Sequence, residues 1–113
     1  MRIEIRGRNV TVDDELRRHT ERRFAKVARQ VSPLAQLDVE LYEERNPSIR
    51  ASQVAAAPLH LKGVTLRARD SSEDLGHSIS LVADELGRQV TRHRDKRRGR
   101  REGARVQPPP AAS

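Results

Sequence analysis

The order of hydrophobic and polar residues predicts four strands. Hydrophobic and polar positions alternate in residues 2–8, 37–42, 54–61 and 64–69, which is the period of a strand with one buried face. The third segment is irregular, because alanines are weak strand formers and Pro58 has no N–H to donate to a neighbouring strand. We therefore expect Pro58 at a sheet edge or a bulge. Residues 44–52 contain Asn46-Pro47 and are predicted to form a turn or hairpin loop.

Two further segments have the spacing of amphipathic helices. In the first, hydrophobic positions recur from Leu16 to Val31, Asp13 precedes them as a cap, and Ser32-Pro33 is expected to end the helix. The second helix is expected to begin with Ser71 or Ser72 as its cap. Its buried positions are predicted to be Leu75, Ile79, Val82, Leu86 and Val90. Beyond these the hydrophobic spacing ends, so we expect the last turns to project past the sheet.

The element order is strand, helix, strand, strand, strand, helix. Each strand has one apolar face, and two helices cover only one side of a sheet. We therefore predict a two-layer α+β domain: a four-stranded sheet with both helices on one face, spanning residues 1–98. Residues 99–113 contain glycines and three consecutive prolines among basic residues, and are predicted to form a disordered basic tail.

The excess positive charge is concentrated at the C-terminal end. Residues 88–105 contain nine basic and two acidic residues, a balance of +7, and the whole chain has 23 basic and 16 acidic residues, also +7. Residues 1–87 therefore have no net charge. Such a concentration of positive charge is unfavourable in isolation, because like charges repel one another. It becomes favourable beside a polyanion, where neutralised phosphates release counterions. A nucleic-acid partner is our first hypothesis, and a solvated tail without a specific partner is the alternative.

Composition narrows the class of protein further. A length of 113 residues predicts one domain. Aromatic residues make up only 2% of the chain, which argues against recognition by base stacking. The absence of cysteine excludes disulfides and thiolate metal sites, and no hydrophobic run has the length of a membrane span or a signal peptide. We expect a soluble, cytoplasmic protein without a cofactor.

Basic residues recur on both predicted helices. On the first helix they lie nearly opposite the hydrophobic face, among interspersed glutamates, so an ordinary solvated surface is an equal alternative there. On the second helix they are not balanced by acids. The candidate RNA-binding residues are Arg22, Lys26, Arg29, Arg88, Arg92, His93, Arg94, Lys96, Arg97 and Arg98.

Two stretches are similar to one known family. Residues 7–27, GRNVTVDDELRRHTERRFAKV, and residues 72–96, SEDLGHSISLVADELGRQVTRHRDK, resemble the ribosome hibernation promoting factors and the ribosome-associated inhibitor of translation. The pairs Arg88-Gln89, Arg92-His93 and Asp95-Lys96 stand where that family has its R-Q, K-H and D-K pairs. The resemblance covers about residues 1–98 and implies a fold related to double-stranded RNA-binding domains. It also implies binding to ribosomal RNA in the small-subunit channel that holds messenger and transfer RNA.

The sequence departs from the family pattern at three places. Gly76-His77 replaces a tyrosine-alanine pair near the start of the last helix, and Pro58 stands where the third strand normally pairs. The chain also ends soon after the basic helix, so it is similar to a short form of the family. Long members have a second domain that pairs two ribosomes.

Other sites are weakly indicated. The four histidines show no metal-ligand spacing, no serine lies in a nucleophile motif, and the acidic pairs are explained by a helix cap and a strand end, so an enzyme is not expected. We expect a translation inhibitor that binds the small ribosomal subunit and its ribosomal RNA. We expect it to bind neither a membrane nor a small-molecule substrate, and to be monomeric away from the ribosome. The alternatives are a general double-stranded RNA or DNA binder, and an interaction module whose tail binds an acidic protein.

Overall fold

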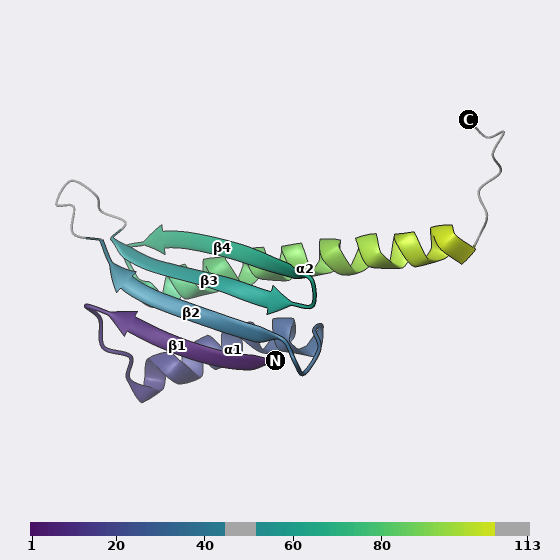
Figure 1. The fold of residues 1–113 in the computed structure, drawn as a ribbon. Coiled ribbons are helices and arrows are strands. Elements are labelled where there is room, and N and C mark those ends of the chain that lie inside the picture. The colour runs from purple at the N-terminus through teal and green to yellow at the C-terminus, as the bar shows by residue number, and fades with distance from the viewer. Residues whose placement is uncertain (45–51, 106–113) are drawn as a thin grey trace.

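A computed structural model describes residues 1–44 and 52–105, with side chains up to Arg97. The elements occur in the predicted order (Figure 1). They are β1 (Arg2–Arg8), α1 (Asp14–Arg29), β2 (Gln36–Glu43), β3 (Gln53–Leu61), β4 (Val64–Ser72) and α2 (Leu75–Arg105). All four predicted strands and both helices are present. The loop expected at residues 44–52 lies mostly outside the described residues, although Glu44 N donates to Ser52 O at its base, at 2.8 Å.

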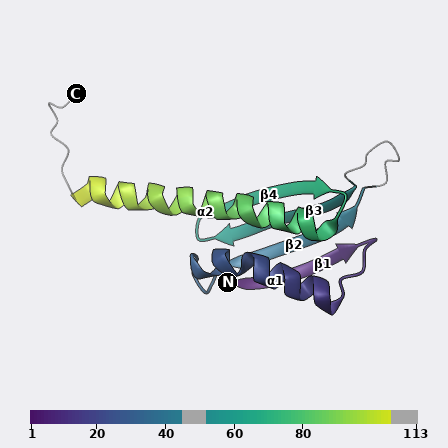
Figure 2. The ribbon, with the colours of Figure 1, turned by 180° about the vertical axis from the view of Figure 1, so that it is seen from behind.

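The strands form one sheet in the order β1-β2-β3-β4. β1 and β2 are parallel, because α1 carries the chain back across the sheet between them, and the two remaining pairs are antiparallel. Both helices lie on the same face (Figures 1 and 2), with α1 behind β1 and β2 and α2 behind β3 and β4. The predicted two-layer α+β fold is confirmed.

Pro58 does not lie where the sequence analysis placed it. It belongs to β3, which has partners on both sides, so it is neither in an edge strand nor at a bulge. The register of β2 with β3 is the same on both sides of Pro58, from Leu37 opposite Leu59 to Glu40 opposite Ala56. Between these pairs no pairing to β2 is made, because proline has no N–H to donate. The sheet accommodates Pro58 by omitting pairing on one side only.

The core lies between the helices and the inner sheet face. Leu37 and Leu41 of β2 are fully buried, as are Phe24 of α1 and Ile79 and Leu86 of α2. Strand alternation and helical spacing thus point to the same interior. Asp38 and Glu40, at the alternate positions of β2, face the outer side of the sheet.

The helix ends show how the local sequence sets their limits. Asp13 caps α1 as predicted, its Oδ1 accepting from Leu16 N at 2.8 Å. α1 ends at Arg29, just before the expected stop at Ser32-Pro33. The predicted cap of α2 was wrong. Asp74 Oδ2 accepts from His77 N at 3.0 Å, whereas the two serines proposed as caps end β4.

The last buried position on α2 is Val90, which is 2% exposed, among the residues whose side chains are described. The helix then continues away from the sheet (Figure 1), as expected from its hydrophobic spacing. It reaches Arg105 and so includes residues 99–105 of the segment expected to be a disordered tail, whereas residues 106–113 lie outside the described residues. Gly99 and Gly103, which were expected to mark a disordered end, lie within the helix.

Candidate nucleic-acid interface

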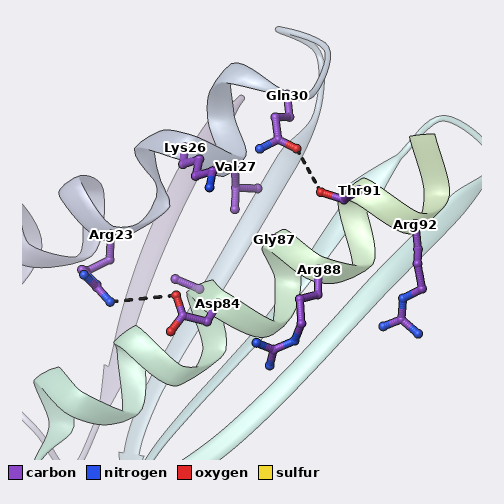
Figure 3. Close-up of a pocket in the computed structure, with 10 residues that line it drawn as sticks. Arg23, Lys26, Val27, Gln30, Asp84, Gly87, Arg88, Thr91 and Arg92 are labelled. Carbon is purple, nitrogen blue, oxygen red and sulfur yellow. Dashed lines mark hydrogen bonds and ion pairs between the residues drawn. The ribbon is translucent and has the colours of Figure 1, made fainter. Parts of the chain in front are cut away.

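A groove of about 530 Å³ runs between α1 and α2 on the surface of the helical layer. Four basic side chains and one acidic side chain line it, together with small and polar residues (Figure 3). The basic residues are Arg23 and Lys26 of α1 and Arg88 and Arg92 of α2; the acidic residue is Asp84. The groove is therefore electropositive and draws its charge from both helices.

Two contacts bridge the groove, and an open section lies between them. Arg23 Nη2 lies 3.9 Å from Asp84 Oδ1, and Thr91 Oγ1 lies 3.5 Å from Gln30 Oε1 (Figure 3). Gly87 lies on α2 between Asp84 and Thr91. The two contacts mark the ends of a gap between the helices. On the α2 side of this gap lies Gly87, which has no side chain to fill it.

Glu85 positions the arginines of α2. Arg88 Nε and Nη2 donate to Glu85 Oε2 at 3.1 and 2.8 Å, and Arg92 Nη2 lies 3.8 Å from Glu85 Oε1. The hydrogen bonds from Arg88 and then from Gln89 hold the pKa of Glu85 below its ordinary value. Both arginine side chains remain largely exposed, at 64% and 74%. They are oriented by one carboxylate and still available to a second anion.

Gln89 fixes α2 against the sheet. Its Nε2 donates to Arg67 O on the edge strand β4 at 2.8 Å, and also to Glu85 Oε1 at 3.1 Å. The side chain next to Arg88 thus ties the basic segment to the domain.

A second hollow, of about 600 Å³, lies where α2 leaves the sheet. Its apolar lining includes Leu34, which is 93% exposed, and Val90. Its basic and titratable lining residues are His60, Lys62, His93, Arg94 and Arg97. The hollow extends the electropositive surface along the projecting helix.

The outer face of the sheet has a different electrostatic character, because several of its basic side chains lie beside an acidic one. Arg8 Nη2 lies 3.3 Å from Glu40 Oε1, and its guanidinium lies 4.6 Å from the centre of the Tyr42 ring. His60 Nε2 lies 3.1 Å from Asp38 Oδ2. The excess positive charge of the chain lies in residues 88–105, on the second half of α2.

The predicted site residues fall into three groups. Lys26, Arg88 and Arg92 line the inter-helix groove. His93, Arg94 and Arg97 line the second hollow. The others line neither: Arg22, Arg29 and Lys96 are exposed, and the Arg98 side chain lies outside the described part.

Sequence reasoning missed Arg23, Gln30, Gly87 and Thr91, which also line the groove. A helical projection contained a signal for two of them, because Arg23 and Gln30 lie four residues before and three residues after the buried Val27, on its side of the helix. The signal was not usable without knowing that α2 lies beside that face.

No three side chains among His, Cys, Asp and Glu gather as a metal site would require, over residues 1–44 and 52–105. Neither helix, over the same part of the chain, combines the length and apolar character needed to cross a membrane.

A family model described as sigma 54 modulation protein / S30EA ribosomal protein matches residues 3–98. The chain belongs to this family. The match includes all of the sheet except Arg2, together with α1 and the part of α2 that carries the predicted basic side chains. The family suggested by the resemblance of residues 7–27 and 72–96 is thereby confirmed.

Relatives of two lengths match this S30EA family chain. The "Ribosome hibernation promoting factor" of Salmonella typhimurium is 31% identical over 96 residues, covering 85% of this chain and 96% of the relative. The "Ribosome hibernation promotion factor" of Picosynechococcus is 28% identical over 102 residues, covering 89% of this chain. Our chain spans only about half of that relative, 53%.

Two solved structures have the same fold as this chain. The N-terminal domain of Thermus thermophilus Protein Y has a TM-score of 0.70 and 26% identity, covering 82% of this chain and 99% of that one. A ribosomal subunit interface protein from Coxiella burnetii has a TM-score of 0.68, covering 84% and 99%. At 19% identity the second supports the fold alone.

One departure from the family pattern has a structural explanation. His19 Nε2 lies 3.0 Å from Gly76 O, which brings the imidazole of α1 against the first turn of α2. A Cβ at Gly76 would lie 3.3 Å from Asp74 Oδ2 and 3.5 Å from His19 Nε2. A side chain at this position would press slightly on the capping carboxylate of Asp74, whereas its contact with His19 would be an ordinary one.

Proposed function

We propose that this protein is a ribosome hibernation factor that binds the small ribosomal subunit through its ribosomal RNA and blocks messenger and transfer RNA binding. The observation that carries the proposal is the joining of basic side chains from α1 and α2 in one groove, continued along a projecting helix, in a chain of the S30EA family. Two of the relatives described above are named for ribosome hibernation, which supports the same role.

The proposed mechanism is occupation rather than catalysis. Arg88 and Arg92 present guanidinium donors that suit phosphate oxygens, and the covered core holds the helices that carry them. A folded domain seated on ribosomal RNA excludes other RNA from the same channel. We propose that the protein acts in the cytoplasm, as a monomer away from the ribosome, with residues 1–98 as the ribosome-binding domain. No cofactor is required by this mechanism.

Two measurements test the role. Sucrose-gradient sedimentation should place the protein with small subunits, and in vitro translation should fall with increasing protein and recover with excess initiation components. If saturating protein neither sediments with small subunits nor lowers translation, the proposed function is wrong.

A general nucleic-acid binder is the second candidate, because the exposed arginine and lysine side chains of α2 would attract any phosphate backbone. Salt titrations on small subunits and on a generic RNA duplex separate the two. A ribosome-specific protein should retain affinity for small subunits at a salt concentration that abolishes binding to the duplex. Equal affinity for both across the salt range favours the general binder.

A further inference from the structure

Gly87 lies at the centre of the inter-helix groove. It belongs to the interior of α2, far from either helix end, where glycine is less favourable than alanine because of its backbone freedom. Its backbone is helical, unlike that of Gly63, which has a positive φ of 80° in the turn between β3 and β4. Backbone conformation therefore does not require glycine at position 87.

Packing within the protein does not require it either. A Cβ built at Gly87 would meet no atom within 4 Å, among the residues that the structure describes. By contrast, a Cβ at Gly7 would lie 2.6 Å from Val10 O, and that glycine is needed for close approach within the chain. Gly87 leaves space on the surface of the groove, and no other part of the described chain uses that space.

The space has the surroundings of an anion site. It lies between the two bridging contacts, Arg23 with Asp84 and Gln30 with Thr91 (Figure 3). Lys26 lines it from α1 and Arg88 from α2. The carboxylate of Asp84 is held at one end by Arg23, so it is partly neutralised before a ligand arrives.

We propose that this gap receives one segment of RNA sugar-phosphate backbone, and that Gly87 is the point where the RNA comes nearest to the protein. The proposal rests on the RNA binding proposed above and adds a position that determines how closely the RNA is seated. RNA backbone is the occupant we favour because it combines negative charge with a continuous strand that can pass between Lys26 and Arg88. The absence of a side chain at Gly87 lets the strand reach the bottom of the groove.

The test compares stability and binding in the same variants. Gly87→Ala and Gly87→Leu are measured in the full chain, beside His77→Ala and His77→Leu at an exposed position of α2 outside the groove. The readouts are the thermal midpoint and the dissociation constants for purified small subunits and for a generic RNA duplex at fixed salt.

We expect Gly87→Ala to raise the thermal midpoint by about 4 °C, because helix propensity improves and nothing is displaced. The same variant should bind small subunits several-fold more weakly, and Gly87→Leu more than tenfold more weakly, as the side chain fills the gap. Both His77 variants should bind within twofold of the natural chain. Ala serves as the test if Leu disturbs the packing of the helices.

The outcomes separate the two proposals. If the natural chain binds small subunits and both Gly87 variants bind as tightly, the role of Gly87 is wrong and the proposed function stands. If the natural chain binds only the duplex, the proposed function is wrong, and weaker duplex binding by the Gly87 variants still supports the gap as an RNA site. If the natural chain binds neither RNA, both proposals fail.

Discussion

Replacing three basic residues of α2 tests whether the helix carries the binding energy. Arg88, Arg92 and Lys96 are exposed and follow one another at intervals of four residues, so they lie along one side of the helix. Alanine at all three positions removes three positive charges while keeping a strong helix former at each. The core residues of α2 are unaffected, and circular dichroism should show an unchanged fold.

The magnitude follows from counterion release. Each phosphate contact contributes a slope of about −0.7 to −0.9 to the dependence of log affinity on log salt. Relative to 1 M salt, one contact at 0.1 M therefore contributes roughly a fivefold to eightfold gain in affinity. Loss of three contacts should weaken binding to small subunits about 130-fold to 500-fold at 0.1 M salt, and reduce the slope by about 2.1 to 2.7.

A charge-matched control separates local contacts from net charge. Arg2, Arg6 and Arg67 are exposed on the outer face of the sheet, and their replacement by alanine removes an equal number of positive charges. Binding is measured by filter retention or fluorescence anisotropy across a range of salt. If the control weakens binding as much as the helix variant does, the attraction is nonspecific. An unchanged salt slope in the helix variant would also refute the reasoning.

Three further outcomes are expected. Truncation after Gly99 should weaken small-subunit binding only modestly, since the predicted binding residues precede it; a loss larger than that of the triple variant would reverse the ranking. Glu85→Gln should strengthen RNA binding about twofold to fivefold in a binding titration, because Arg88 loses a competing carboxylate. That gain should be constant from pH 8 to pH 6, because Glu85 has a lowered pKa and is ionised over this whole range. The stabilising pairing of Glu85 with Arg88 is lost only as the pH falls through that lowered pKa. Ser78→Ala should lower the free energy of unfolding in urea by about 1–3 kcal/mol, because Ser78 Oγ is buried and donates to Gln53 O. Ser80→Ala, which removes a hydroxyl that donates to Gly76 O within α2, should change it by less than about 1 kcal/mol.

Local patterns predicted the elements well because burial acts on them directly. Leu37, Val39 and Leu41 are inward at every second position, so the period of the sequence is the period of the strand. The placement of Pro58 could not be predicted in this way. Whether a strand has one neighbour or two depends on the order of the sheet, and the sequence near Pro58 is compatible with either.

The candidate site was predicted in composition but not in arrangement. The basic residues of both helices were found from charge, since lysine and arginine are visible in the sequence wherever they lie. Which of them share a groove depends on how α1 and α2 pack, and Gly87 became informative only once its surroundings were known. The cap of α2 was missed because Ser71, Ser72 and Asp74 are all good caps, and only the paired end of β4 decides among them.

The missing pairing at Pro58 lies on the boundary between two halves of the domain, which share one core. One half consists of β1, α1 and β2, and the other of β3, β4 and α2; they meet in the sheet along the β2–β3 boundary, where Pro58 interrupts the pairing. In the helical layer the same boundary falls between α1 and α2 (Figure 2), at the groove bridged by Arg23 and Asp84. Because proline removes a donor, the group of β2 left without a partner in the sheet is a carbonyl. We expect the β2–β3 ladder to open most easily at this point, so backbone amides beside it should exchange with solvent sooner than those farther along β2. A ligand that contacts both helices would join the two halves, and so slow that exchange from the opposite side of the molecule.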